Sequence, residues 1–180
     1  MTIKHIFIVG AGTMGNGIAQ VAATSGYRVT CMDVMPAALE KAKAVIQKST
    51  AKLLEKEKIT PEQKAAADGI TFASDMSAIG EADLIIEAAT ENPELKFKIF
   101  KEMDEKAREG VILATNTSSI SITKIANSTS RPDKVIGMHF MNPVPLMKLV
   151  EVIRGLGTSD ETTQTTVDVC KAMGKEPVEA

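Results

Sequence analysis

Short apolar runs alternate with longer amphipathic stretches along the whole chain. The short runs are typical of strands buried on both faces of a sheet, and the longer stretches place apolar residues at helical spacing. The pattern predicts strands at residues 6–9, 28–33, 70–72, 83–88, 111–115, 135–139 and 148–153. It predicts helices at residues 13–25, 36–58, 93–109 and 159–173, with a short polar insert at 60–69.

Strands that alternate with helices form βαβ units, which favour a mainly parallel sheet covered by helices on both faces. The sequence therefore predicts an α/β fold, a Rossmann-type doubly wound sheet, with residues 1–180 as one domain. Ligands of such sheets bind in the crevice at the carboxyl ends of the strands. Polar clusters follow the predicted strands at that edge, at 10–15, 33, 87–92, 116–119 and 139–145.

The first of these clusters is a glycine-rich turn, which reads Gly10-Ala11-Gly12-Thr13-Met14-Gly15. In the G-x-G-x-x-G pattern the first glycine permits a tight turn, the second lets a pyrophosphate approach, and the third lets helix and strand pack closely. Asp33 ends the second strand about 20 residues later, where a carboxylate binds an adenosine ribose. That carboxylate repels a 2′-phosphate, so we expect NAD rather than NADP. The alternative is a glycine turn without a ligand.

Composition and charge exclude several other functions. The net charge is −2, the isoelectric point is about 5.8 and aromatic residues make up 3%, so a nucleic-acid partner is not expected. The apolar runs are too short to span a membrane, and we identify no signal peptide. Cys31 and Cys170 lie in apolar segments, which is typical of buried thiols in a reduced cytoplasmic protein. We expect no metal site.

The chain has two histidines. His5 precedes the first predicted strand at its amino end, which indicates a structural or surface role. His139 ends a strand on the crevice side, and its imidazole suits an acid–base role near neutral pH. If the chain folds back about Pro145, Glu151 faces His139 and can orient the imidazole. The alternative is a chance histidine at a strand end beside a solvated glutamate.

Five segments together resemble the L-3-hydroxyacyl-CoA dehydrogenase family. They are GAGTMGNGIAQ at 10–20, Glu91-Asn92, NTSS at 116–119, GMHFMNPVP at 137–145 and MKLVEVI at 147–153. The resemblance runs the length of the chain and is greatest to bacterial members that act on 3-hydroxybutyryl-CoA. It implies an NAD-dependent oxidoreductase that interconverts 3-hydroxyacyl-CoA and 3-oxoacyl-CoA by hydride transfer, with an acyl-CoA as its partner molecule.

The resemblance also assigns roles to individual residues. It implies His139 as the base, Glu151 as the carboxylate that orients it, and Ser118 as a contact of the substrate oxygen. The implied NAD contacts are Gly10, Ala11, Gly12, Thr13, Met14, Gly15, Asp33, Glu91, Lys96, Asn116, Ser118 and Asn142. The implied CoA contacts are Ser49, Lys56 and Ser118.

Each of these assignments has a structural alternative. Ser118 could cap a following helix, and Asn142 could merely initiate the Asn-Pro turn. Glu91 and Lys96 could be surface charges, and Ser49 and Lys56 could belong to a solvated, lysine-rich helix face.

Family members carry a further C-terminal helical domain that forms the dimer interface. The resemblance therefore implies that this chain is the N-terminal domain of a cytoplasmic homodimer or higher homo-oligomer, in fatty-acid or butanoate metabolism. Two other functions stay open at this point. The chain could belong to a dehydrogenase of a free hydroxy acid or sugar acid, or to a dinucleotide-binding protein without turnover, which would not need the His139–Glu151 pair.

Overall fold

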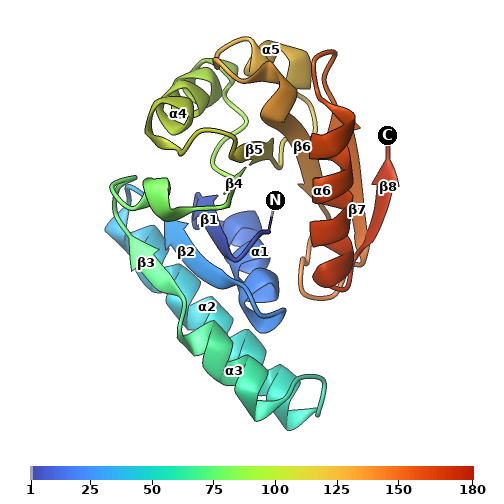
Figure 1. Cartoon of the computed structure of the whole chain (residues 1–180). Coiled ribbons are helices and arrows are strands. Elements are labelled where there is room, and N and C mark those ends of the chain that lie inside the picture. Colours follow the sequence, from blue (N-terminus) through green and yellow to red (C-terminus); the bar gives the residue numbers. More distant parts are fainter. Residues whose placement is uncertain (1) are drawn as a thin grey trace.

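Strands and helices alternate along the chain as predicted (Figure 1). The computed structural model describes residues 2–180. The strands are β1 (His5–Val9), β2 (Arg28–Met32), β3 (Thr71–Ala73), β4 (Leu84–Glu87), β5 (Ile112–Thr115), β6 (Val135–Phe140), β7 (Leu149–Arg154) and β8 (Glu176–Glu179). The helices are α1 (Thr13–Thr24), α2 (Pro36–Glu55), α3 (Pro61–Asp68), α4 (Pro93–Lys106), α5 (Ile122–Ala126) and α6 (Asp160–Ala172), with short 3₁₀ turns at Ile79–Glu81 and Pro132–Lys134.

All strands of the described residues belong to one eight-stranded sheet, in the order β3-β2-β1-β4-β5-β6-β7-β8. Neighbouring strands are parallel except β6 and β7, which form an antiparallel pair. The first six strands have the order of a dinucleotide-binding doubly wound sheet. The predicted Rossmann-type fold is therefore confirmed.

Successive side chains of β1 pack alternately into two separate hydrophobic cores. Ile6 and Ile8 pack in the core beneath α1, α2 and α6, whereas Phe7 and Val9 pack in the core beneath α4 and α5. A strand buried on both faces needs apolar residues at every position, which explains the continuous run at 6–9. The hydrophobic layers fix the sheet and leave the polar residues at the strand ends free to form a site.

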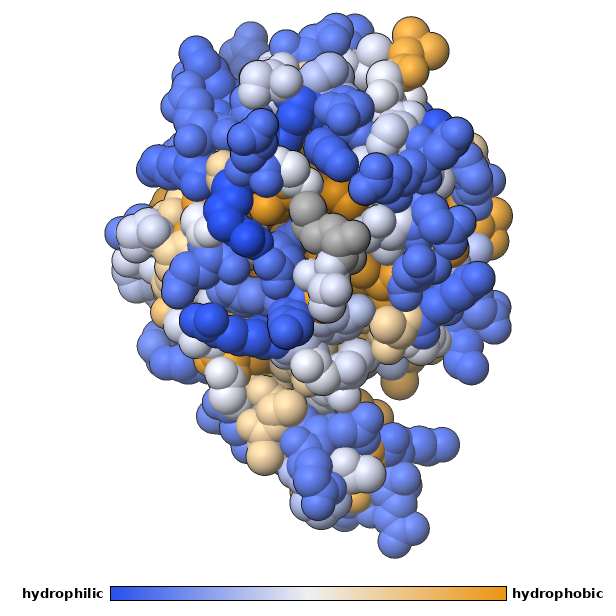
Figure 2. Space-filling view, viewed as in Figure 1, coloured by the Kyte–Doolittle hydropathy of each residue, from blue (hydrophilic) through white to orange (hydrophobic). Residues whose placement is uncertain are grey.

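Two α-helices and one strand were not predicted. The insert at 60–69 forms α3, where Thr60 and Gln63 make a capping box and Pro61 occupies the first turn. The other two are α5 and β8, which are too short for a clear periodicity. Figure 1 shows α2 and α3 extending together from the body of the sheet as an arm, and Figure 2 shows that the visible surface is mainly hydrophilic.

The buried thiols are as expected. Cys31 and Cys170 are free within the described residues, and burial raises the pKa of each thiol to about 12. In residues 2–180, no helix is long and apolar enough to cross a membrane.

His5 has the structural role that its position predicted. It is only 3% exposed, and its Nδ1 lies 3.2 Å from the carbonyl oxygen of Glu81. Its Nε2 lies 2.9 Å from the hydroxyl of Thr30, which can donate to it. Burial lowers the pKa of His5 from its usual value of 6.5, so the folded protein holds this imidazole neutral.

We expect the free energy of unfolding to fall as the pH drops below about 6.5, because the unfolded chain then binds a proton that folded His5 does not. The contribution to the slope is at most about 1.4 kcal/mol per pH unit. Urea denaturation between about pH 7.5 and 5.5 should show a shallower slope for His5→Gln than for the wild type. An identical slope of the unfolding free energy against pH in the two proteins would contradict this role. The same measurement on His139→Gln is the control for the other histidine.

Candidate active site

The glycine-rich turn joins β1 to α1 at the carboxyl edge of the sheet. Gly10 has a φ of +109°, which favours glycine, and a Cβ at Gly15 would overlap the carbonyl oxygen of Gly10. A Cβ at Gly12, in contrast, would meet nothing within 4 Å. Among residues 2–180 no side chain caps α1, and its first turn carries no acid. The open approach and the positive helix end fit the phosphates of a dinucleotide.

Asp33 lies against this turn. Its Oδ2 accepts the backbone N–H of Ala11 at 2.9 Å, and its Oδ1 accepts that of Met35 at 2.9 Å. A carboxylate has about four acceptor sites, so Asp33 retains capacity for a ribose hydroxyl. A pocket of about 350 Å³ opens beside it, with mainly apolar walls from Val9, Met32, Val34, Met76, Leu95 and Ile99. This arrangement fits the adenosine part of NAD.

His139 and Glu151 form the predicted pair. They lie directly opposite each other in the antiparallel β6–β7 register, and His139 Nδ1 lies 2.9 Å from Glu151 Oε1. Because an ionised carboxylate can only accept, Nδ1–H donates this bond and Nε2 remains for another partner. The side chain of His139 is 21% exposed and that of Glu151 is 38% exposed, so the imidazole is accessible yet held.

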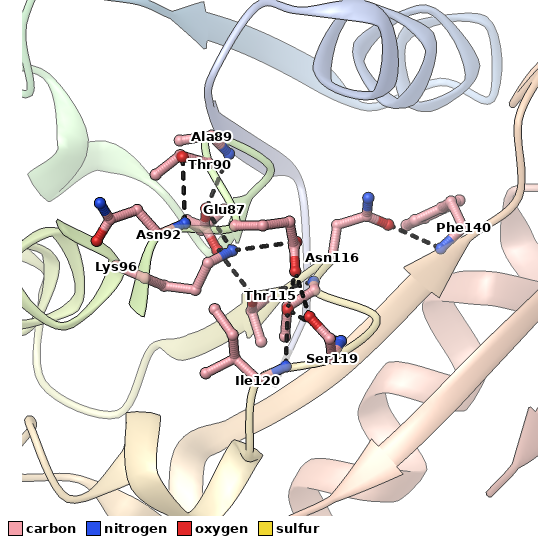
Figure 3. Close-up of polar contacts among 12 residues, drawn as sticks. Glu87, Ala89, Thr90, Asn92, Lys96, Thr115, Asn116, Ser119, Ile120 and Phe140 are labelled. Carbon is pink, nitrogen blue, oxygen red and sulfur yellow. Dashed lines mark hydrogen bonds and ion pairs between the residues drawn. The ribbon is translucent and has the colours of Figure 1, made fainter. Parts of the chain in front are cut away.

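A buried ion pair stands at the ends of β4 and β5 (Figure 3). Lys96 Nζ donates to both carboxylate oxygens of Glu87, at 2.8 and 3.0 Å, and the two side chains are 1% and 0% exposed. The hydroxyl of Thr115 and the N–H of Ala89 donate to the same carboxylate at 2.7 and 2.8 Å. Lys96 is therefore not the surface lysine of the structural alternative.

Glu91 holds the turn that carries Ser118. Its Oε2 accepts the hydroxyls of Thr117 and Ser119, both at 2.8 Å, while Lys96 Nζ lies 3.9 Å from its Oε1. Ser118 itself is exposed between these two anchors.

The side chain of Ser121, not that of Ser118, accepts the N–H of Lys124 and caps α5, so the helix-cap alternative for Ser118 is wrong. Asn116 ties the turn to the histidine strand, since its Oδ1 accepts the N–H of Phe140 at 2.8 Å (Figure 3).

Ser49 and Lys56 line a separate cleft of about 210 Å³ with Lys52, Leu53, Pro143, Pro145 and Leu146. One wall comes from α2 and its end, and the other from the connection between β6 and β7. Ser49 Oγ accepts a hydrogen bond from Gln20 at 3.0 Å, and Lys56 is exposed. The structure therefore brings the two predicted CoA contacts into one cleft. Asn142 is exposed on the connection that forms the opposite wall.

Glu87 belongs to the polar cluster predicted at 87–92, but the sequence predicted no partner for it and no role for Thr115. The sequence does contain a signal for this buried pair, because Glu87 ends an otherwise apolar strand. A fully buried carboxylate requires a charged or hydrogen-bonding partner. The predicted contacts with NAD and CoA remain predictions. Lys96 differs from the other predicted contacts, because its side chain is 1% exposed and lies beneath the carboxyl edge against Glu87.

Residues 5–180 match the family model described as 3-hydroxyacyl-CoA dehydrogenase, NAD binding domain. The chain is 46% identical over 173 residues to a 3-hydroxybutyryl-CoA dehydrogenase of Clostridioides difficile, covering 96% of this chain and 62% of that protein. It is 45% identical over 184 residues to the mitochondrial hydroxyacyl-coenzyme A dehydrogenase of Rattus norvegicus, covering 98% of this chain and 58% of that protein. The chain thus spans about three fifths of the length of these curated relatives.

The structure is similar to a crystal structure of (S)-3-hydroxybutyryl-CoA dehydrogenase from Ralstonia eutropha. The TM-score is 0.95 at 50% sequence identity, and the match covers 99% of this chain and 63% of that one.

Gly12→Ala should change NAD binding, whereas Gly15→Ala should change stability. Because a Cβ at position 12 meets open space, Gly12→Ala should leave the melting temperature nearly unchanged but weaken NAD binding, as the methyl group occupies the approach of the pyrophosphate. Gly15→Ala should instead lower the melting temperature, because its Cβ overlaps the Gly10 carbonyl. Calorimetric titration with NAD and thermal unfolding measure the two effects. Unchanged NAD affinity in Gly12→Ala would contradict the placement of the cofactor.

Lys96→Met should destabilise the chain by about 3–5 kcal/mol, because it leaves the buried Glu87 carboxylate without its counter-ion. Lys106→Met is the matched control, since Lys106 pairs with Glu102 at 2.7 Å on the exposed side of the same helix. The control should leave the free energy of unfolding nearly unchanged. Urea denaturation compares the two variants. Equal losses of unfolding free energy would show that the buried pair stabilises the chain no more than the exposed one.

Proposed function

The chain belongs to the 3-hydroxyacyl-CoA dehydrogenase family, and on that premise we propose that it forms the NAD-binding domain of an enzyme that interconverts 3-hydroxyacyl-CoA and 3-oxoacyl-CoA. The observation that supports this most strongly is the His139–Glu151 pair, positioned beside the carboxyl edge of a dinucleotide-binding sheet. A protein that merely binds a dinucleotide has no need of an oriented imidazole there.

In this proposal, His139 moves the proton of the reaction. Glu151 holds Nδ1–H, so Nε2 takes the proton from the 3-hydroxyl of the substrate, and the carboxylate stabilises the imidazolium that forms. Ser118, exposed on the turn that Glu91 anchors, donates a hydrogen bond to the same oxygen. When bound, NAD supplies the hydride acceptor.

NAD would be held by the glycine turn and Asp33, with Glu91, Asn116 and Asn142 beside it. The buried Lys96 would act on this site through its ion pairs with Glu87 and Glu91. Asp33 supports NAD over NADP, because a carboxylate at the ribose repels a 2′-phosphate and the next residues, Val34 and Met35, carry no positive charge. Ser49 and Lys56, in the α2 cleft, would contact CoA, where a lysine can pair with a phosphate.

We further propose 3-hydroxybutyryl-CoA as the substrate, because this is the substrate in the names of the bacterial relatives at 46–50% identity. A role in fatty-acid or butanoate metabolism, in the cytoplasm, is part of the proposal and comes from the family resemblance alone. A homo-oligomeric state is carried over from the family resemblance.

Replacing His139 with Gln in the full gene product should lower kcat by roughly 10²- to 10⁴-fold with little change in NADH affinity, the usual scale for a positioned acid–base group. Glu151→Gln should impair the same step and change the pH–rate profile, because it removes the charge that stabilises the imidazolium. NADH oxidation with acetoacetyl-CoA measures both.

Glu109→Gln, at an exposed position, is the matched control and should keep wild-type kcat. Full activity in both site variants would remove the pair from the mechanism. Turnover of a free 3-oxo acid at the rate of acetoacetyl-CoA would favour a substrate other than an acyl-CoA.

A further inference from the structure

Lys175 is a buried lysine that the proposed mechanism does not use. It lies between α6 and β8 and is 8% exposed. Its Nζ donates to the carbonyl oxygens of Val144 at 2.5 Å and Met147 at 2.7 Å. Burial lowers the pKa of Lys175, and the nearby charge of Lys148 lowers it further. Because burial removes water from the ammonium group, the two carbonyl acceptors are needed to stabilise its charge.

Both acceptors belong to the connection between β6 and β7, which comprises residues 141–148. Within this connection, the N–H groups of Leu146 and Met147 donate to the carbonyl oxygen of Pro143, both at 3.0 Å, which closes one turn. Pro143 and Pro145 have no N–H to donate, so these bonds do not tie the turn to α6. A single ammonium that binds two of its carbonyls closes the connection onto the end of α6.

The opposite side of the connection packs against α1. Val144 is 2% exposed, and a Cβ at Gly17 would lie only 2.9 Å from Val144 Cβ. Gly17 therefore provides the space into which Val144 fits. The connection is held from two sides, by the α1 surface at Gly17 and by the ammonium of Lys175.

The same connection supplies one wall of the cleft that contains Ser49 and Lys56, through Pro143, Pro145 and Leu146. We propose that Lys175 is a positioning residue for acyl-CoA binding, which holds this wall at the correct distance from α2. The inference rests on the proposed function, since it assumes that CoA occupies the cleft. Lys175 contacts neither cofactor nor substrate in this role. It acts through the backbone of residues 144–147.

The test replaces Lys175 with Met in the full gene product and measures KM for acetoacetyl-CoA, kcat and the Kd of NADH. We expect KM to rise about 10- to 100-fold with kcat and the Kd of NADH little changed, because the cleft wall binds the substrate equally in its ground state and its transition state. Lys175→Arg keeps the charge and the donors, so it should recover part of the lost affinity. Lys171→Met, at an exposed lysine near the end of α6, is the matched control and should behave as the wild type.

A folded Lys175→Met protein with wild-type KM would overturn the proposal, whatever its melting temperature, because a purely structural role would change stability alone. If that variant does not fold, KM for acetoacetyl-CoA is measured in Gly17→Ala instead. The added methyl group displaces Val144 and with it the cleft wall, while the ammonium of Lys175 remains. Raised KM in Gly17→Ala with an unchanged Kd of NADH supports the proposal, and unchanged KM overturns it. A wild-type protein that oxidises no NADH with acetoacetyl-CoA contradicts the proposed function itself, which separates the two failures.

Discussion

In a doubly wound sheet, parallel strands must all end at the same edge, and the polar residues at the ends of these strands are brought together by that constraint. β1, β4, β5 and β6 run side by side in one direction, so the glycine turn, Glu87, Asn116 and His139 lie at or directly after strand ends that are next to one another. The one antiparallel neighbour, β7, returns along β6 and places Glu151 beside His139. The apolar layers on both faces fix these strand ends without contributing to the chemistry.

Two buried ammonium groups shape the loops around this edge. Lys96 neutralises Glu87 inside the protein and lies near Glu91, which anchors the turn on both sides of Ser118. Lys175 fixes the connection between β6 and β7 through carbonyl oxygens instead of a carboxylate. Buried charges of this kind contribute little net stability, but the loss of one partner is costly. They hold loops in one arrangement, which is what a site built from several loops requires.

Features set by residues close together in the sequence could be predicted from it. The pairing of His139 with Glu151 follows from a reversal about Pro145, because the register of a hairpin depends only on nearby residues. The bonds of Glu87 to Thr115 and of Lys175 to Val144 join residues 28 and 31 positions apart, so no local periodicity reveals them. The helix α3 could have been predicted from Thr60 and Gln63, but it buries only Ala67, so its apolar signal is weak.

We propose that the imidazole held by Glu151 contacts the reacting oxygen of an acyl-CoA at the carboxyl edge of the sheet. The most direct measurement is the distance from His139 Nε2 to the 3-oxygen of acetoacetyl-CoA in a crystal structure of the full gene product with NAD. We expect a hydrogen bond of about 2.6–3.2 Å, with the Nδ1 bond to Glu151 intact. A substrate whose 3-oxygen lies away from His139, or an imidazole turned away from Glu151, would contradict it.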